Sequence, residues 1–150
     1  MKTLFASVVV GAVSLVLAQA QTSSPSDKKS TSDKDKGVVH ISSEKATFTE
    51  RFPGASMSVV WGDPDKGAHA TFTKFVPGWD GGMHTHTANV WLVVIKGAYL
   101  YKDDAGEKRV GPGEFIRIPA GHKHWSGRDK TEGALFYQEG SGKIDKVDAK

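Results

Sequence analysis

The sequence contains no cysteine in its 150 residues. Disulfide bonds, thiolate metal ligands and cysteine nucleophiles are therefore all excluded, as is a lipid anchor attached to an N-terminal cysteine. Small exported domains often use disulfides as cross-links, so an exported domain of this composition must depend on its core, and a partner subunit is one further source of stability.

The sequence also lacks an excess of charge of either sign. It has 20 Lys and Arg against 17 Asp and Glu, a formal net charge of +3. The lysine-rich stretch over residues 27–36 is offset by Asp27, Asp33 and Asp35. Proteins that bind nucleic acid carry a concentrated basic stripe with interleaved aromatic residues. The sequence has no such stripe, so we expect no nucleic-acid partner.

Long apolar runs are absent apart from one near the N-terminus, Leu4–Leu17. This run is shorter than the roughly 20 residues that a membrane-spanning helix needs. Lys2 precedes it, and Ala18-Gln19-Ala20 follows as a small-x-small cleavage pattern. Residues 1–20 are therefore predicted to be a secretory signal peptide, with a retained N-terminal anchor as the alternative. The mature protein should begin near Gln21 and be periplasmic or secreted, with no membrane association after cleavage.

A second segment, residues 21–37, has almost no apolar residue to bury and consists mainly of Ser, Thr, Lys and Asp. Such a composition predicts a disordered linker. From Val38 the pattern changes to short apolar or alternating runs, and it continues to about Val147. We therefore expect a single domain over residues 38–147.

Within this domain we find no window with the period of 3.6 residues that an amphipathic helix requires. Apolar runs are instead separated by turn signals such as Gly62-Asp63-Pro64 and Gly111-Pro112-Gly113. Many short strands at even spacing predict an all-β sandwich or closed barrel. The strands we expect are Val38–Ile41, Ala46–Glu50, Ser56–Trp61, Ala70–Val76, Ala88–Ile95, Tyr99–Lys102, Phe115–Ile118 and Ala134–Gln138.

Two histidines, His84 and His86, stand one residue apart after a glycine cluster. Successive side chains on a strand alternate between its faces, so both imidazoles should point the same way. We expect them to begin a strand whose inward row is otherwise apolar. That row consists of Ala88, Val90, Leu92 and Val94.

A third histidine, His124, follows the turn sequence Pro119-Ala120-Gly121. Inward imidazoles are costly to bury without partners, and one metal ion satisfies several at once. We therefore predict one divalent ion on His84, His86 and His124, with Fe, Zn, Mn, Ni and Cu all admissible. The alternative is a barrel that retains the histidines without a metal.

The spacing of these residues resembles the two motifs of the cupin superfamily. The first runs from Gly78 through His84-Thr85-His86 to Gly97, and the second from Gly113 through Pro119-Ala120-Gly121 to His124. This resemblance implies a cupin double-stranded β-helix, or jelly-roll barrel, with a metal at one mouth. It also implies a homodimer and a small-molecule substrate or ligand. More narrowly, Trp61-Gly62-Asp63-Pro64 and His84-Thr85-His86-Thr87 resemble an uncharacterised branch of single-domain cupins akin to ChrR-type sensors and diketone-cleaving dioxygenases.

The sequence departs from the cupin pattern at two positions. Val90 stands where the motif has a glutamate ligand, and Arg128 stands where it has an asparagine. Valine cannot coordinate a metal, so the implied site has three neutral imidazoles. Such a site keeps the full charge of a divalent ion and leaves coordination positions open.

The sequence leaves open the roles of two further residues near the three histidines. His122 is either a fourth ligand or, as we favour, a rim histidine that faces solvent. Met83 would favour copper if its thioether faced the site, although packing is the preferred interpretation. His40 and His69 are interpreted as surface or packing residues.

Two functions follow from this reasoning. The resemblance implies an Fe(II)-type dioxygenase or related oxidoreductase that acts on a small oxygen-rich molecule, because three ligands leave open positions on the ion. The competing hypothesis is a non-catalytic metal- or small-ligand-binding cupin, since Val90 removes the usual carboxylate. No catalytic residue is assigned from the sequence.

Overall fold

The computed structural model describes residues 37–149, so the expected signal peptide and nearly all of the expected linker lie outside the described residues. The described residues form strands and contain no helix, and hence no helix able to cross a lipid bilayer. The strands are β1 (Thr49–Phe52), β2 (Ala55–Gly62), β3 (His69–Phe75), β4 (Asp80–Thr85), β5 (Val90–Gly97), β6 (Tyr99–Asp103), β7 (Gly106–Val110), β8 (Phe115–Ile118), β9 (His124–Arg128), β10 (Ala134–Gly140) and β11 (Val147–Asp148).

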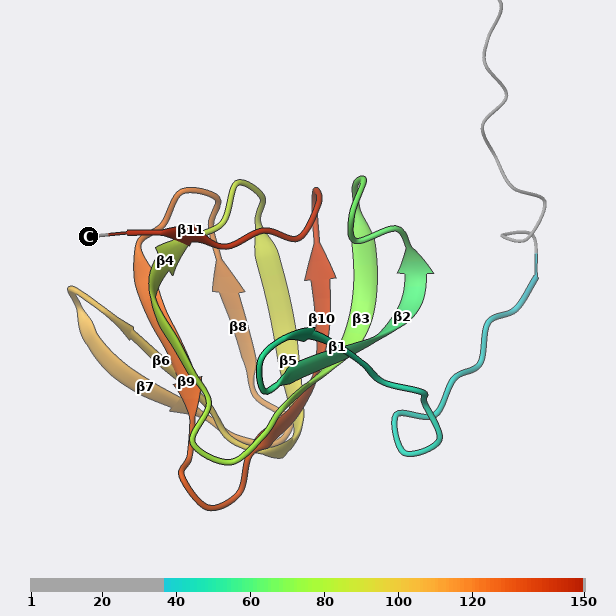
Figure 1. Cartoon of the computed structure of the whole chain (residues 1–150), viewed down its shortest axis with the longest axis horizontal. Helices are drawn as coiled ribbons and strands as arrows, with labels where there is room; N and C mark the ends of the chain where they lie inside the picture. Colours follow the sequence, from blue (N-terminus) through green and yellow to red (C-terminus); the bar gives the residue numbers. More distant parts are fainter. Residues whose placement is uncertain (1–36, 150) are drawn as a thin grey trace, which may run out of the picture. The chain divides into compact units, whose positions relative to one another are not determined.

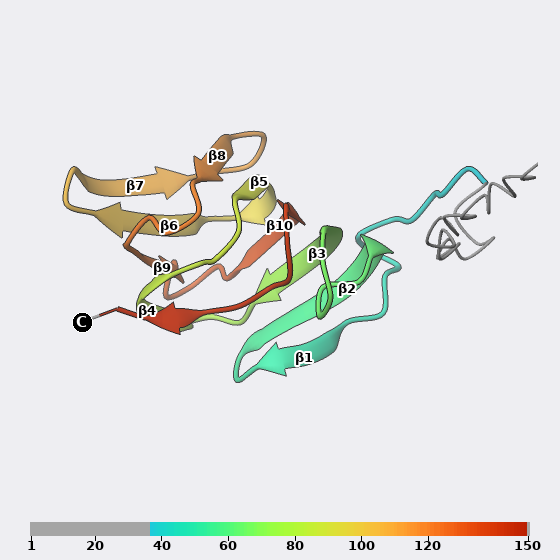
Figure 2. The ribbon, with the colours of Figure 1, turned by 90° about the horizontal axis from the view of Figure 1, so that it is seen from above.

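These strands form two antiparallel sheets. The six-stranded sheet has the order β1-β2-β3-β10-β5-β8, and the five-stranded sheet has the order β11-β4-β9-β6-β7. Neighbours in each sheet are often far apart in the sequence, as Figure 1 shows for β5 and β10. Figure 2, turned by 90° so that the domain is seen from above, shows the sheets as two layers with their inner faces turned toward each other. The predicted all-β fold of packed antiparallel sheets is confirmed.

The core lies between the inner faces of the two sheets. On β5, the alternate residues Val90, Leu92 and Val94 are buried, as the period of two requires. They meet Phe136, which is fully buried on β10. The rest of the core cluster comprises Tyr99, Tyr101, Val110, Ile118 and Ala134.

Several expected strands shift or disappear. Val38–Ile41 forms no strand, and the first strand lies at Thr49–Phe52 and not at Ala46–Glu50. The sequence prediction missed β7, because its central residues are charged and exposed and so carry no alternation. It also missed β4 as a separate strand, because two of its residues are glycine.

The expected single strand running from His84 through Val94 is wrong. Strand β4 ends at Thr85, and β5 begins at Val90 in the other sheet. The intervening residues are held as a connection, where the amide of Ser141 donates to the carbonyl of Asn89. The chain therefore changes sheets directly after the first pair of histidines.

After β10, the chain crosses the end of the domain as a segment that we call the C-terminal strap, residues 141–149. Figure 1 shows it in dark red, running from the top of β10 to the outer side of β4. The amide of Ile144 donates to the carbonyl of Pro64, and the amide of Ala149 donates to that of Met83. The strap thus ties the two sheets together at the end where the histidines lie.

Candidate metal centre

His84 and His124 face each other across neighbouring strands. They are direct register partners on β4 and β9, so their side chains share one face of the five-stranded sheet. Their ring centroids are 4.3 Å apart. A bulge between Asp80 and Met83 sets this register. Gly82 supplies the positive φ of 65° that the bulge uses, and its amide donates to the Asp80 carboxylate.

His86 joins this pair from the connection that follows β4. Its ring centroid lies 4.9 Å from that of His84 and 5.2 Å from that of His124. One ring nitrogen from each of the three residues lies within 4.8 Å of the others. The structure therefore brings together the three residues that the sequence predicted, in a group that could hold one metal ion.

In each ring, one nitrogen forms a hydrogen bond with a backbone carbonyl. The Nδ1 of His84 is 2.8 Å from the oxygen of Gly82, that of His86 is 2.6 Å from the oxygen of Asp145, and that of His124 is 2.9 Å from the oxygen of His122. A carbonyl can only accept, so each Nδ1 carries the proton and each Nε2 keeps a lone pair. Carbonyl partners of this kind orient metal-binding histidines.

The Nε2 atoms of the three rings are suited to bind a metal ion, and without one a buried Nε2 has no partner. The Nε2 of His124 is buried and has no hydrogen-bond partner. A buried polar atom without a partner is costly. Three convergent lone pairs on neutral imidazoles suit a divalent ion, whose bonds to nitrogen are about 2.1 Å long. The donor set thus fits the group that the cupin pattern implies.

Burial also favours the metal-binding form of the rings. Desolvation lowers the pKa of His84 and His86, and it lowers the pKa of His124 to about 4. Neighbouring imidazoles lower the pKa values of His84 and His124 further, because two protonated rings would repel each other. At neutral pH each ring is therefore neutral, with its single proton on Nδ1.

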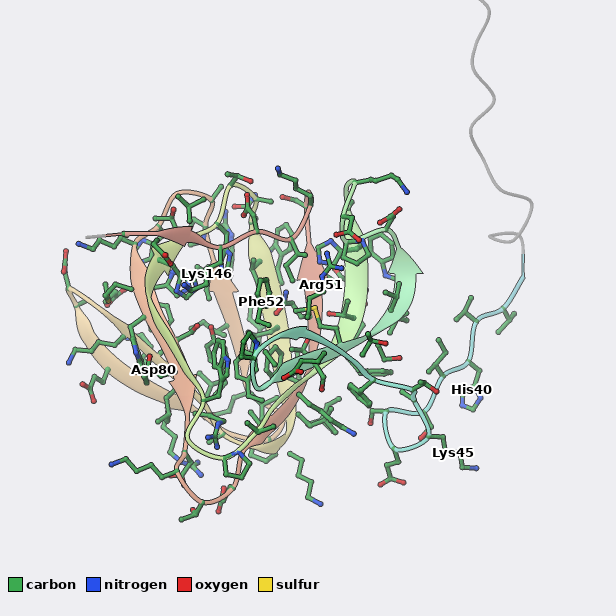
Figure 3. The ribbon with its side chains drawn as sticks, in the orientation of Figure 1. His40, Lys45, Arg51, Phe52, Asp80 and Lys146 are labelled. Carbon is green, nitrogen blue, oxygen red and sulfur yellow. The ribbon has the colours of Figure 1, made fainter. Side chains whose placement is uncertain are left out.

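A cavity adjoins the histidines between the two sheets. The volume open to the centres of water-sized molecules is about 50 Å³, which is room for only a few small groups. Val90 lines it at the position of the missing glutamate, together with the polar residues Thr73, Ser126 and Gln138. Most of the remaining wall is apolar: Phe52, Ala55, Met57, Phe75, Trp79, Tyr99 and Ile144. Figure 3 labels Phe52 and, on the strap, Lys146.

Neither of the two residues whose role the sequence left open adds a side-chain ligand to the three-histidine group. His122 is exposed, outside the three-histidine group, and its Nε2 lies 3.0 Å from the Asp103 carboxylate. The favoured interpretation as a rim histidine is confirmed. Met83 pairs with Trp125 on the opposite face of the sheet from His84, so its thioether does not face the site.

The other notable residues are structural. Arg128 is buried and donates to the carbonyl of Asp129, and its Nη2 lies near Gly78, away from the histidines. His69 is buried and packs over Gly140, where any side chain would meet its ring, and its Nδ1 lies 3.0 Å from the oxygen of Gly67. His40 is exposed. Both histidines are thus the surface and packing residues that the sequence predicted.

The contribution of the strap to the site was not predicted from the sequence. The carbonyl of Asp145 orients His86, and the side chain of Asp145 accepts hydrogen bonds from the amide and hydroxyl of Thr87. Nothing in the sequence pattern signals this contact across 59 residues. Gln138 was also missed, although its polar side chain shares the parity of the apolar Ala134 and Phe136 and could have been recognised.

Comparisons with known proteins agree with this architecture. Residues 71–138 match the cupin domain family. No curated protein matches the chain. Among solved structures, the chain is similar to the polyketide cyclase RemF from Streptomyces resistomycificus, with a TM-score of 0.62 and 18% identity over 76% of this chain and 87% of that one. It is also similar to KdgF from a Halomonas species, with a TM-score of 0.54 and 20% identity over 66% and 91%. An RmlC-like cupin from Shewanella frigidimarina has a TM-score of 0.56 and 17% identity over 70% and 92%.

Proposed function

Because residues 71–138 form a cupin domain, we propose that this protein is a metal-dependent cupin enzyme in which His84, His86 and His124 hold one divalent ion. The observation that carries the proposal is the convergence of the three imidazoles, each with Nδ1 occupied by a carbonyl and Nε2 left to bind. Three protein ligands with open positions are typical of catalytic and not of closed structural sites.

The reaction we propose is an oxygenation of a small oxygen-rich molecule, of the Fe(II)-type dioxygenase class. A bound ion of this kind would supply Lewis acidity and redox chemistry. The chain would supply orientation and a water-poor pocket, through Val90 and the aromatic wall around Trp79. Fe, Zn, Mn, Ni and Cu remain chemically admissible, but Met83 offers no thioether to favour copper.

Metal content is the first test. We expect protein purified without an affinity tag to contain about one equivalent of metal by elemental analysis, and His86→Ala to lose it. The matched control is His122→Ala, which changes an exposed histidine outside the group. Equal metal content in the native chain and His86→Ala would contradict the proposed site.

Oxygen consumption is the second test. The Fe(II)-loaded protein should consume oxygen with a member of a panel of β-diketones, catechols and thiols, and His124→Ala should not. The alternative, a non-catalytic binding protein, is favoured by one observation: both carboxylate oxygens of Asp145, the only carboxylate among the described residues that line the cavity, are engaged by Thr87. Full metal loading without turnover in any metal form would support that alternative.

We also propose that the protein is a homodimer. The outer face of the six-stranded sheet carries exposed apolar side chains, among them Phe115, which is 61% exposed. Trp91, Val93 and Tyr137 line the same shallow depression as Phe115. Light scattering after gel filtration should give twice the chain mass for the native protein, and Phe115→Glu should give the mass of one chain.

Export is the remaining proposal, and it depends on the N-terminal sequence. Lys2, the apolar run and Ala18-Gln19-Ala20 support cleavage after residue 20. Mass spectrometry of protein recovered from the periplasm or medium should show a chain that begins near Gln21. An intact N-terminus in the cytosolic fraction would contradict it.

A further inference from the structure

We infer that the molecule taken up by this cavity is a small anion, a carboxylate or an enolate, and that Lys146 on the strap selects it; the inference rests on the metal site proposed above. Lys146 lines the same cavity as His84 and His86. No motif in the sequence drew attention to it.

The register of the strap directs Lys146 toward the histidines. On β11, Val147 pairs with Thr85 and Asp148 pairs with His84. The same antiparallel register sets Lys146 opposite His86, and side chains of opposed residues lie on one face of a sheet. The side chain of Lys146 is 30% exposed, whereas that of Asp148 is 85% exposed. The register places both side chains on the face of His84 and His86, and their exposure separates them. Lys146 lines the cavity, whereas Asp148 lies in solvent and accepts a hydrogen bond from the Lys146 ammonium.

The charges at this site do not balance. A divalent ion on three neutral imidazoles keeps both of its charges, and Lys146 adds a third. Asp145, whose oxygens accept hydrogen bonds from Thr87, and Asp148 each carry one negative charge, so one positive charge is left over. Asp148 forms an ion pair with Lys146 from the solvent side. Positive charges close together in a poorly solvated space repel each other, and an anion bound among them relieves the repulsion.

The size and walls of the cavity restrict the rest of the ligand. About 50 Å³ is open to water-sized molecules, so only a small anionic group fits beside the histidines. The neighbouring wall includes Trp79, which stacks on Phe75 with ring centroids 3.8 Å apart. The ligand that fits is a carboxylate or enolate with a short apolar substituent, whose oxygens lie between the histidines and the Lys146 ammonium.

Acetate and acetamide serve as probes, since they have almost the same shape and differ in charge. Each is titrated into the Co(II)-loaded protein, and binding is followed through the visible absorption of the cobalt. The variant Lys146→Met keeps the apolar stem and removes the charge. The control is Lys143→Met, which changes a strap lysine that does not line the cavity. Metal content and circular dichroism are measured for every variant.

The native chain and Lys143→Met should bind acetate more tightly than acetamide. Lys146→Met should keep one equivalent of cobalt but bind acetate about tenfold more weakly, because a charge-assisted hydrogen bond is lost. Its affinity for acetamide should stay unchanged. Acetate affinity within about twofold of native in Lys146→Met, with cobalt retained, would overturn the role of Lys146 and leave the metal site standing. Failure of the native chain to bind cobalt would overturn both.

Discussion

At the scale of single residues, the site depends on three neutral rings whose protons are held by carbonyls. Burial, and not a nearby carboxylate, is the largest cause of their lowered pKa values. The site is thus prepared for a metal by desolvation together with the fixed tautomer. This arrangement has two measurable consequences.

The first consequence concerns metal affinity. His124→Ala removes the most deeply buried of the three rings, so we expect the dissociation constant for Co(II) or Zn(II) to rise by at least about 100-fold. Calorimetric titration of metal-free protein measures it. His122→Ala, two residues away and bonded to Asp103, should bind the metal as the native chain does. An equal loss of metal affinity in His124→Ala and His122→Ala would indicate that substitutions near the start of β9 disturb the whole strand.

The second consequence concerns stability against pH. The folded-state pKa of His124 is about 4, below its unfolded value of 6.5. Above pH 6.5 the His124 ring is neutral in both the folded and the unfolded state. Between about pH 6.5 and pH 4 the ring takes up a second proton in the unfolded state but not in the folded state. The free energy of unfolding of metal-free protein should therefore fall as the pH falls through this window. His124 alone contributes on the order of 3 kcal/mol to this loss.

Urea unfolding of metal-free protein at several pH values measures this dependence. Aspartates with lowered pKa values, such as Asp103, also stabilise the fold. Their contribution to the free energy of unfolding is lost only below their unfolded pKa of about 3.9, so it can be separated from that of His124. A free energy of unfolding that stays constant from about pH 7 to pH 5 would contradict the buried, neutral histidines.

At the scale of elements, the strap and the turns between strands determine whether the site assembles. The strap supplies the carbonyl that orients His86, and Asp145 binds it to Thr87 through two hydrogen bonds. Asp145→Ala should therefore weaken metal binding about tenfold, the range expected when a supporting contact of a metal ligand is removed. Metal titration measures it, with Lys143→Ala as the control on the same strap. Native affinity in Asp145→Ala would show that the backbone alone orients His86.

A turn between β5 and β6 requires glycine for two reasons. Gly97 has a φ of 74°, and a Cβ at this residue would lie 2.2 Å from the carbonyl oxygen of Gly133. That oxygen also accepts a hydrogen bond from Ala98. We expect Gly97→Ala to reduce the free energy of unfolding by more than about 3 kcal/mol, since backbone strain adds to the clash.

The matched control is Gly113→Ala, where φ is 81° but a Cβ would meet nothing within 4 Å. It should lower the free energy of unfolding by only about 1–2 kcal/mol, the cost of the left-handed backbone alone. Denaturant unfolding of both variants gives the comparison. Equal effects would show that the contact with Gly133 is relieved by a small movement of the chain.

At the scale of the whole molecule, the three-histidine group spans the change from one sheet to the other. His84 and His124 lie on the five-stranded sheet, and His86 lies on the connection to the six-stranded sheet. A bound ion should therefore stabilise the entire fold. At a free metal concentration of 100 times the dissociation constant, the free energy of unfolding should rise by about 2.7 kcal/mol. Thermal unfolding with and without metal measures it, and His84→Ala should show almost no gain.

Much of this protein was determined by the sequence alone. Alternation along Ser56–Trp61, Ala70–Val76 and Ala134–Gln138 located β2, β3 and β10, because a half-buried strand must place apolar side chains on one face. The pair His84 and His86 and the distant His124 likewise identified the group that could hold a metal ion, since a motif records residue types and spacing. These properties are local, so a linear pattern carries them.

Tertiary structure decided how the site is assembled around those ligands. The change of sheet between Thr85 and Val90, the outward direction of Met83 and the contact of Asp145 with His86 all depend on strand pairing across tens of residues. So does the position of Lys146 in the wall of the same cavity. No local pattern encodes which backbone carbonyl will meet an imidazole or which lysine will turn toward a cavity. These contacts are set by the packing of the whole barrel, because only the folded chain brings such distant residues into register.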